Sequence, residues 1–262
     1  MASIGDLWDD VARAVAFLSR IPVPQRHFVN HDGRLERAVR AFPLAGMLIT
    51  LPAATLAALL SALQTSSLFT AFLVVAVQVI ATGALHEDGL GDTADGFGGG
   101  RDRESALAIM KDSRVGTYGA LALILSIGLR VSALASFLPL LTPIGGGLTL
   151  VGAAALTRAA MVWHWSRLPS ARSDGVAASA GTPDPQATST ALGSAVLFAL
   201  LLFYAAGVPV IAMLLALAAF ALTVKAFGKI ASRKLGGHTG DTIGATQQLT
   251  EIAILGALAL AI

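Results

Sequence analysis

Residues 118–141 read YGALALILSIGLRVSALASFLPLL, and Arg130 is the only charged residue in this stretch. An α-helix needs about 20 consecutive apolar residues to cross a bilayer, so the stretch predicts a membrane-spanning helix. The whole chain has the same character, because 55% of its 262 residues are hydrophobic and 13% are charged. Soluble domains carry about 25% charged residues. The sequence therefore predicts an integral membrane protein, and the absence of cysteine excludes disulfides and thiolate metal sites.

The same criterion predicts about seven spans, which together form an all-α fold: a polytopic transmembrane helix bundle that is one integral membrane domain over residues 1–262. The expected spans are 41–63, 68–85, 118–141, 145–165, 191–206, 209–225 and 243–262. Only Gly207 and Val208 separate the fifth span from the sixth, which favours a tight helical hairpin over one long broken helix.

The N-terminal segment predicts an amphipathic helix that lies in the membrane interface and ends before Pro22 and Pro24. Its apolar residues recur at helical spacing: Leu7, Val11, Ala14, Val15 and Leu18.

The charged residues predict the orientation of the bundle. If seven spans alternate, 16 of the 18 lysines and arginines fall on one side, and the remaining two, Arg130 and Arg158, fall within spans. The opposite connections carry no charge. By the positive-inside rule the charged side is cytoplasmic, so we expect a multi-pass protein of the cell inner membrane whose active site faces the cytoplasm. The net charge of +2 is too small to indicate nucleic acid as a partner.

The most informative segment, HEDGLGDTADGFGGG at residues 86–100, follows the second span directly. Asp88, Asp92 and Asp95 are spaced i, i+4 and i+7, so on a continuing helix they share one face. Three carboxylates on one face repel one another unless a cation lies among them, and carboxylate oxygens suit Mg²⁺ or Mn²⁺. The glycines that follow, including Gly98 and Gly99, allow the backbone to approach a ligand closely.

Two further clusters predict contacts with phosphate. In the first, Lys111 and Arg114 flank Ser113 and are three residues apart, so one helical turn could direct both cations at a single phosphate group. The second opens the last span with glycines and backbone N–H groups, which favour anions: Gly237, Thr239 and Gly240. Asp241, the next residue, is predicted to be a helix N-cap, a metal ligand or a base. His238 is predicted to be a structural residue.

Three ionisable residues lie within the predicted spans, where such groups are costly and are usually paired or functional. Their depths along the helices are compatible with an ion pair between Glu251 and Arg158, or less favourably between Glu251 and Arg130. For Arg158, a structural pair and contact with a substrate phosphate remain equal alternatives.

These blocks together resemble the cobalamin synthase family, the adenosylcobinamide-GDP ribazoletransferases. The resemblance covers most of the chain through five blocks: FLSRIPVP at 17–24, HEDGLGDTADG at 86–96, IMKDSRVG at 109–116, ARSDG at 171–175 and GGHTGDTIGA at 236–245. Gly91 stands where many members carry alanine.

The resemblance implies a defined reaction. A hydroxyl of α-ribazole, or of α-ribazole 5′-phosphate, attacks the phosphate joined to adenosylcobinamide in adenosylcobinamide-GDP, and GMP leaves. Asp88, Asp92 and Asp95 would hold Mg²⁺, with Glu87 or Asp241 as further ligands. The remaining partners implied are the lipid bilayer and other membrane-bound enzymes of corrinoid assembly.

Positioning and cations supply most of the catalysis in such phosphoryl transfers. Lys111 and Arg114 would neutralise phosphate oxygens, and the general base is Asp95, Asp241 or a metal-bound oxygen.

Two other functions compete with this one. A CDP-alcohol phosphotransferase of phospholipid synthesis also has an acidic motif at the membrane edge, but its pattern needs Asp-Gly-x-x-Ala-Arg, whereas Asp88-Gly89 here precedes Gly91-Asp92. A secondary transporter would explain the ionisable residues within spans. It gives no reason for carboxylates gathered on one side.

Overall fold

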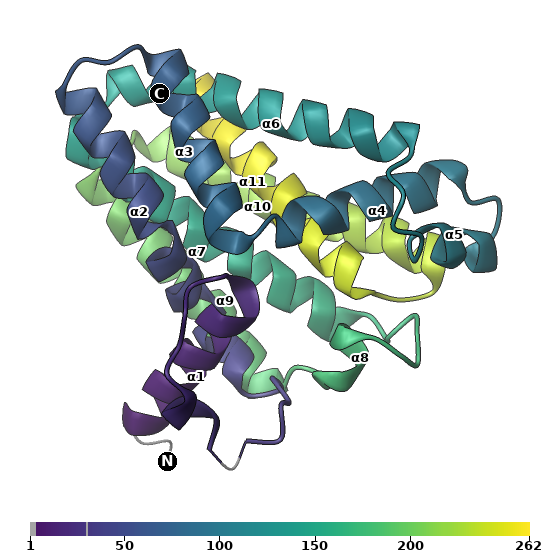
Figure 1. The fold of residues 1–262 in the computed structure, drawn as a ribbon. Helices are drawn as coiled ribbons and strands as arrows, with labels where there is room; N and C mark the ends of the chain where they lie inside the picture. Colours follow the sequence, from purple (N-terminus) through teal and green to yellow (C-terminus); the bar gives the residue numbers. More distant parts are fainter. Residues whose placement is uncertain (1–3, 30) are drawn as a thin grey trace.

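The computed structural model describes residues 4–29 and 31–262, and within these ranges the chain is helical without a β-strand. The helices are α1 (Ile4–Leu18), α2 (Phe42–Ala62), α3 (Ser67–Thr82), α4 (Leu85–Gly99), α5 (Arg103–Ile109), α6 (Thr117–Phe137), α7 (Pro143–Arg167), α8 (Val176–Ser179), α9 (Pro185–Ala205), α10 (Val210–Leu235) and α11 (Gly240–Ala261) (Figure 1). Short 3₁₀ helices η1, η2 and η3 cover Gln25–Phe28, Ala38–Ala41 and Leu138–Leu140. The predicted all-α fold is confirmed.

Six of the described helices are long and apolar enough to span a membrane: α2, α6, α7, α9, α10 and α11. A seventh candidate is the pair α3 and α4, which are bent by 90° relative to each other. The protein is therefore a multi-pass membrane protein. The bend forms where Gly83 and Ala84 both adopt the left-handed conformation, with φ of 63° and 57°. Two such residues end α3 and turn the chain before the acidic helix begins.

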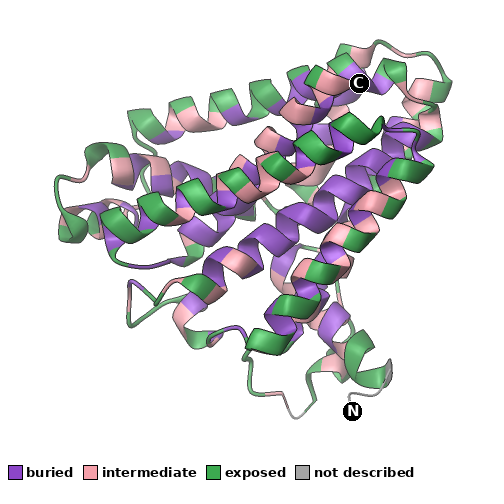
Figure 2. Cartoon of the chain, turned by 180° about the vertical axis from the view of Figure 1, so that it is seen from behind, coloured by how far each residue is buried: buried purple, intermediate pink, exposed green. Residues whose placement is uncertain are grey.

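Helix α7 is the centre of the bundle, and most of its length is buried (Figure 2). It packs against α2, α9 and α11. Small residues allow this close approach: a Cβ on Gly147 would lie 2.9 Å from the Ala54 carbonyl oxygen, and one on Gly152 would lie 2.9 Å from the Phe203 ring. Glycine and alanine serve the same purpose in membrane helix packing generally, because they bring backbones close together.

The predicted hairpin between the fifth and sixth spans is confirmed. Helices α9 and α10 are joined by residues 206–209, with Gly207 in the left-handed region at φ 77°. The α2–α3 turn and the C-terminus lie together at one end of the molecule, whereas α5 and α8 lie away from it (Figure 1). The uncharged connections and the polar segments are thus at different ends of the bundle.

Helix α1 is amphipathic as predicted, but most of its apolar face packs on protein instead of lipid. Val11, Ala14, Val15 and Leu18 are buried in a cluster with residues of η2, α2 and α7. Trp8 is the main apolar side chain left for the membrane interface, with 63% of its surface exposed. Periodicity shows which residues share a face, but the partner of that face depends on the tertiary structure.

Candidate active site

Helix α4 carries the acidic motif and lies between α6 and α11. It approaches α11 closely: a Cβ on Gly89 would lie 2.7 Å from the Asp241 carbonyl oxygen and 3.1 Å from its Cα. This contact requires glycine, and it brings the aspartates of α4 beside Asp241, which is about 150 residues away in sequence. Along α4 the exposure falls from Asp88, which is exposed, to Asp92, which is half-buried, and Asp95, which is buried.

The electrostatics of Asp92 show that the aspartates act on one another. The α4 helix lies beyond the bend, outside the six long apolar helices. Burial raises the pKa of Asp92 to about 7, and the charges of Asp88, Asp241 and Asp95 add to the rise. Arg172 is the one cation that opposes it. The cluster therefore has an excess of negative charge that a divalent cation would relieve.

The carboxylates do not converge in a closed metal cage. Among residues 4–29 and 31–262, no group of three histidine or acidic side chains is placed to hold a metal ion. Mg²⁺ usually takes only one or two carboxylates, and water and substrate phosphate complete its coordination. Asp88 and Asp92 fit that role in their chemistry and charge.

Asp95 faces the start of α6. Its Oδ2 accepts a hydrogen bond from the Gly116 N–H at 2.7 Å, and its Oδ1 accepts one from the Gly119 N–H at 2.8 Å. These bonds satisfy two otherwise unpaired donors at the N-terminus of α6 and tie α4 to that helix. The structure thus gives Asp95 a positioning role, whichever further role it has.

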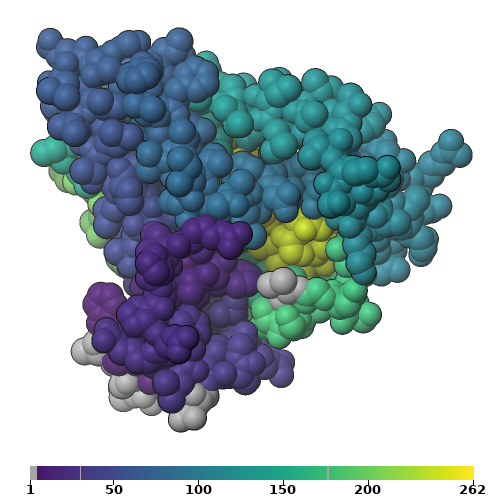
Figure 3. All heavy atoms as spheres, in the orientation of Figure 1, coloured from purple at the N-terminus to yellow at the C-terminus, as the bar shows by residue number. Residues whose placement is uncertain are grey.

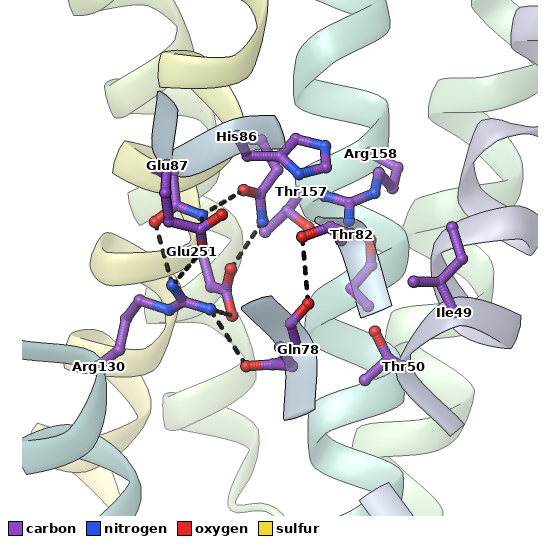
Figure 4. A pocket seen from close by; sticks show the side chains of 13 residues that line it. Ile49, Thr50, Gln78, Thr82, His86, Glu87, Arg130, Thr157, Arg158 and Glu251 are labelled. Atoms are coloured by element: carbon purple, nitrogen blue, oxygen red, sulfur yellow. Dashed lines mark hydrogen bonds and ion pairs between the residues drawn. The ribbon is translucent and has the colours of Figure 1, made fainter. Parts of the chain in front are cut away.

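Glu87 does not join the aspartates. It is buried on another side of α4, where its Oε1 lies 2.9 Å from Nη1 of Arg130 and accepts a second bond from Gln248 at 2.9 Å. Arg130 also contacts Glu251 through Nη2, at 3.5 Å, so the predicted pair between Glu251 and Arg158 is wrong (Figure 4). Depth along a helix was compatible with either arginine, and helix rotation decided between them.

Arg158 lies inside the bundle, away from the aspartates. Its Nε and Nη1 are buried and have no hydrogen-bond partner among the described residues. It lines a small polar cavity of about 20 Å³, together with His86, Thr82 and Thr157 (Figure 4). A space of this size holds about one water molecule. A bound water is a more suitable partner there than a substrate phosphate.

The segment after α5 is not helical, so the expected helical turn at Lys111 and Arg114 is wrong. Lys111 Nζ lies 3.3 Å from Asp174 Oδ2, and Arg114 Nη2 lies 2.5 Å from Asp112 Oδ2. Ser113 is exposed between them. Both cations would have to leave these carboxylates in order to contact a phosphate.

The glycines expected near phosphate have different surroundings. A Cβ on Gly98 would lie 2.5 Å from the Tyr118 ring, so packing explains this glycine. Gly99 is exposed, beside Ile109. Gly237 packs against the Pro169 carbonyl, and Gly240 has open space around its Cα.

The N-cap of α11 is Thr239, whose side chain accepts a hydrogen bond from the Thr242 N–H, so Asp241 is not the cap. Asp241 lies in the first turn instead, where it accepts a weak bond from Thr239 at 3.3 Å. Its side chain remains partly exposed toward the aspartates of α4.

Arg172 is the residue whose role the sequence did not predict. Its Nη1 lies 3.7 Å from Asp241 Oδ2, and its Nη2 donates to the Leu107 carbonyl at 2.9 Å. The preceding backbone is fixed by two bonds of 2.8 Å with His238. Burial lowers the pKa of His238 to about 4, so this residue is neutral near pH 7, and its backbone holds the segment that carries Arg172. The ARSDG block gave the position of Arg172, but no local pattern indicated its acidic partner.

Comparison with known proteins adds independent information. A family model described as cobalamin-5-phosphate synthase matches residues 10–259. The chain is 76% identical over its full length to an adenosylcobinamide-GDP ribazoletransferase from Rhizobium meliloti (strain 1021), and all of that protein is covered. It is 46% identical to the protein of the same name from Azorhizobium caulinodans, with 94% of this chain and 93% of the relative covered. No solved structure matches.

Proposed function

The chain belongs to the cobalamin-5-phosphate synthase family, and from that premise we propose how its residues carry out the nucleotide-loop assembly step of cobalamin synthesis. The protein is a transferase that uses adenosylcobinamide-GDP and ribazole. The observation that carries our assignment of the site is the contact of α4 with α11, which gathers Asp88, Asp92 and Asp241 beside Arg172.

The bonds that change define what the site must do. A ribose hydroxyl oxygen of α-ribazole, or of its 5′-phosphate, forms a new bond to the phosphorus that carries adenosylcobinamide. The bond from that phosphorus to the bridging oxygen of the pyrophosphate breaks, and GMP leaves with the bridging oxygen. The hydroxyl proton must pass to a base. Negative charge grows on the phosphoryl oxygens and on the leaving phosphate, so cationic groups lower the barrier.

Asp88 and Asp92 would hold Mg²⁺, and when bound this ion would neutralise phosphate oxygens. Arg172 is the cation whose charge acts on Asp92, and it also pairs with Asp241. It would therefore contact the transferred phosphoryl group or the leaving phosphate. Lys111 and Arg114 would supply further positive charge if a phosphate displaced Asp174 and Asp112.

Asp241 is our candidate for the base. It faces the aspartates from another helix, and Thr239 and Arg172 orient its carboxylate. Asp95 is less suitable, because both of its oxygens already accept backbone hydrogen bonds.

We place the protein in the cell inner membrane with the site facing the cytoplasm. The support is the clustering of 16 of its 18 lysines and arginines outside the spans and on one side of the predicted topology. Substrates as large and charged as adenosylcobinamide-GDP would then reach the site without crossing the bilayer.

The test uses purified protein in nanodiscs with adenosylcobinamide-GDP and α-ribazole 5′-phosphate, with GMP release as the readout. We expect release that requires Mg²⁺, stops with chelator and falls at least about 100-fold in Asp88→Asn, because a lost ligand removes several kcal/mol of stabilisation. Asp32→Asn, at an exposed aspartate distant in sequence from the cluster, should keep parental activity. Activity in Asp88→Asn equal to the parent would contradict the assigned site.

A CDP-alcohol substrate is the second candidate, and the same preparation distinguishes it. Release of GMP from the guanosine substrate, without CMP from a CDP-alcohol, supports the proposal; the reverse preference would overturn it.

A further inference from the structure

A cavity of about 350 Å³ opens beside the candidate active site, between α1, α4, α7, α8 and α11. In Figure 3 its position corresponds to a hollow in which α11 (yellow) is visible between the N-terminal segment (purple), α4 (blue) and the region of α8 (green). Asp88 and Asp241 line it, and so do Met161 and Trp165 of α7. The cavity is therefore continuous with the acidic cluster on one side and with the bundle core on the other.

We propose that this cavity binds the aromatic base of the ribazole acceptor and holds its ribose at the acidic edge. This inference rests on the proposed function, because it assigns one substrate of that reaction to a place in the fold. The cavity has the size of a small-ligand site, whereas a corrin ring with its amide side chains is several times larger than a nucleoside.

The walls favour a flat apolar base. Phe17, Met161, Trp165 and Ile243 supply aromatic, thioether and aliphatic surface, and most of the exposed lining is apolar. Aromatic and thioether side chains contact a planar ring favourably. A dimethylbenzimidazole ring would bury its methyl groups and both faces against this surface.

Trp165 adds a specific feature. It is almost completely buried, it lines the cavity, and its indole Nε1–H has no hydrogen-bond partner among the described residues. A benzimidazole joined to ribose has one ring nitrogen as an acceptor and no donor, so it leaves few polar groups unpaired against an apolar wall. Guanine carries several donors and acceptors, and most of them would be unpaired in this cavity, which costs binding free energy. The donor nucleotide should therefore bind elsewhere.

The polar edge fits the chemistry that the acceptor undergoes. Asp88 and Asp241 line the same cavity from α4 and α11, so a base between α1 and α7 would leave its ribose facing them. The attacking hydroxyl would then lie on the side of the candidate base and of the aspartates proposed to hold the metal.

The experiment fills the cavity and measures binding without any reaction. Ala16 lines the cavity from α1, and Ala12 is one turn earlier on α1, equally half-buried and not part of the lining. Ala16→Phe is therefore the test variant and Ala12→Phe its matched control. Isothermal titration of α-ribazole and, separately, of GMP into nanodisc-embedded protein with chelator gives the two dissociation constants.

We expect Ala16→Phe to raise the dissociation constant for α-ribazole at least tenfold and to leave that for GMP within twofold, while Ala12→Phe changes neither. Ala177→Leu, which fills the cavity from α8, is the second variant and should act in the same direction. A folded Ala16→Phe and a folded Ala177→Leu that both bind α-ribazole like the parent would overturn the proposal, and so would a selective loss of GMP binding. If both variants fail to fold, the parent decides: α-ribazole, and not GMP, must quench its tryptophan fluorescence.

Turnover separates this inference from the function on which it rests. GMP release with an unchanged KM for the acceptor in Ala16→Phe would refute the cavity assignment and leave the function intact. Binding of α-ribazole that Ala16→Phe weakens, in a protein that releases no GMP, would refute the function and leave the binding site.

Discussion

Nη1 of Arg130 lies 2.9 Å from Oε1 of Glu87, and both side chains are buried in the interior of the bundle. Glu87 is the residue immediately before Asp88, so one turn of α4 has an ion pair on its buried side and a candidate metal ligand on its exposed side. The pair therefore fixes the rotation of α4, and with it the direction in which the aspartates point.

Breaking this pair should destabilise the fold strongly. Glu87→Gln removes the closest partner of Arg130 and leaves Glu251 as the one carboxylate that the described residues place beside two buried arginines in the polar cavity. An uncompensated buried charge of this kind costs about 3–5 kcal/mol. Unfolding by denaturant in detergent micelles measures the change. Glu104→Gln is the control, since Glu104 is exposed and lies 4.0 Å from Arg103, a type of pair that contributes about 1 kcal/mol or less. Equal stability losses in the two variants would mean that the buried pair does not hold α4.

Whether Glu251 pairs with Arg130 or with Arg158 can be tested separately. A double-mutant cycle between Glu251→Gln and Arg130→Met should give a coupling energy of about 1 kcal/mol or more, because the two groups share one network. The corresponding cycle with Arg158→Met should give a smaller coupling. A larger coupling energy with Arg158 than with Arg130 would instead support the pair between Glu251 and Arg158 that helix depth predicted.

Alanine should lower activity at one glycine of α4 and be tolerated at another. Gly89→Ala places a Cβ 2.7 Å from the Asp241 carbonyl oxygen, so α4 must move away from α11, and we expect at least a tenfold fall in GMP release. Gly91→Ala meets only Leu123, at 3.6 Å, and should keep activity while stabilising the helix by up to about 1 kcal/mol. Equal activities would show that the close approach of α4 and α11 does not position the site.

Binding of Mg²⁺ should be linked to a proton on Asp92. The pKa of this carboxyl is raised to about 7, so it holds a proton below that pH and must release it to bind a cation. Between pH 8 and pH 6 the ionised fraction falls about tenfold, so the affinity for Mg²⁺ should fall by about the same factor. Titration of Mg²⁺ at several pH values measures this, and Asp92→Asn should remove most of the dependence.

The raised pKa of Asp92 also decides whether the stability of the fold rises or falls with pH. Because the pKa in the fold lies above the ordinary value of 3.8, the folded state binds the proton more tightly than the unfolded chain. Without Mg²⁺, stability should therefore fall as the pH rises toward 7, and added Mg²⁺ should reverse the loss. A metal-free protein that becomes more stable over this range in the parent but not in Asp92→Asn would contradict the shift.

Arg172 should matter more for catalysis than an exposed arginine nearby. Arg172→Met removes the cation beside Asp241, and we expect kcat/KM to fall about 100-fold or more, as when other charge-stabilising donors are removed. Arg101→Met, at an exposed position, should stay close to the parent. Partial recovery in Arg172→Lys would indicate that charge matters, whereas none would indicate that the bidentate geometry of arginine is needed.

The fold was largely predictable because its determinants are local. Runs of apolar residues give the spans, and Gly207 with Pro209 gives the hairpin of α9 and α10. The 90° bend was not predicted, because it depends on Ala84 in a conformation that alanine rarely adopts. The cluster of Asp88 and Asp92 was also predictable, since their spacing places them on one helix face.

Contacts between distant segments could not be predicted in the same way. Glu87 is adjacent to Asp88 in sequence, yet it pairs with Arg130 of another helix. Lys111 and Arg114 looked like a phosphate clamp only on the assumption of a helix, and the chain between α5 and α6 forms none.

By itself, then, the sequence determined that this protein is a helical membrane bundle, that its acidic residues gather beyond the second span, and that it resembles one enzyme family. These properties depend on composition, on helical periodicity and on the order of short sequence motifs, all of which are local features of the chain. Only the tertiary structure decided that Arg172 faces Asp241, that Arg130 holds Glu87, and that Trp165 lines a cavity next to Asp88. The reason is physical: packing of the helices sets their rotation and close approach, and these decide which side chains meet.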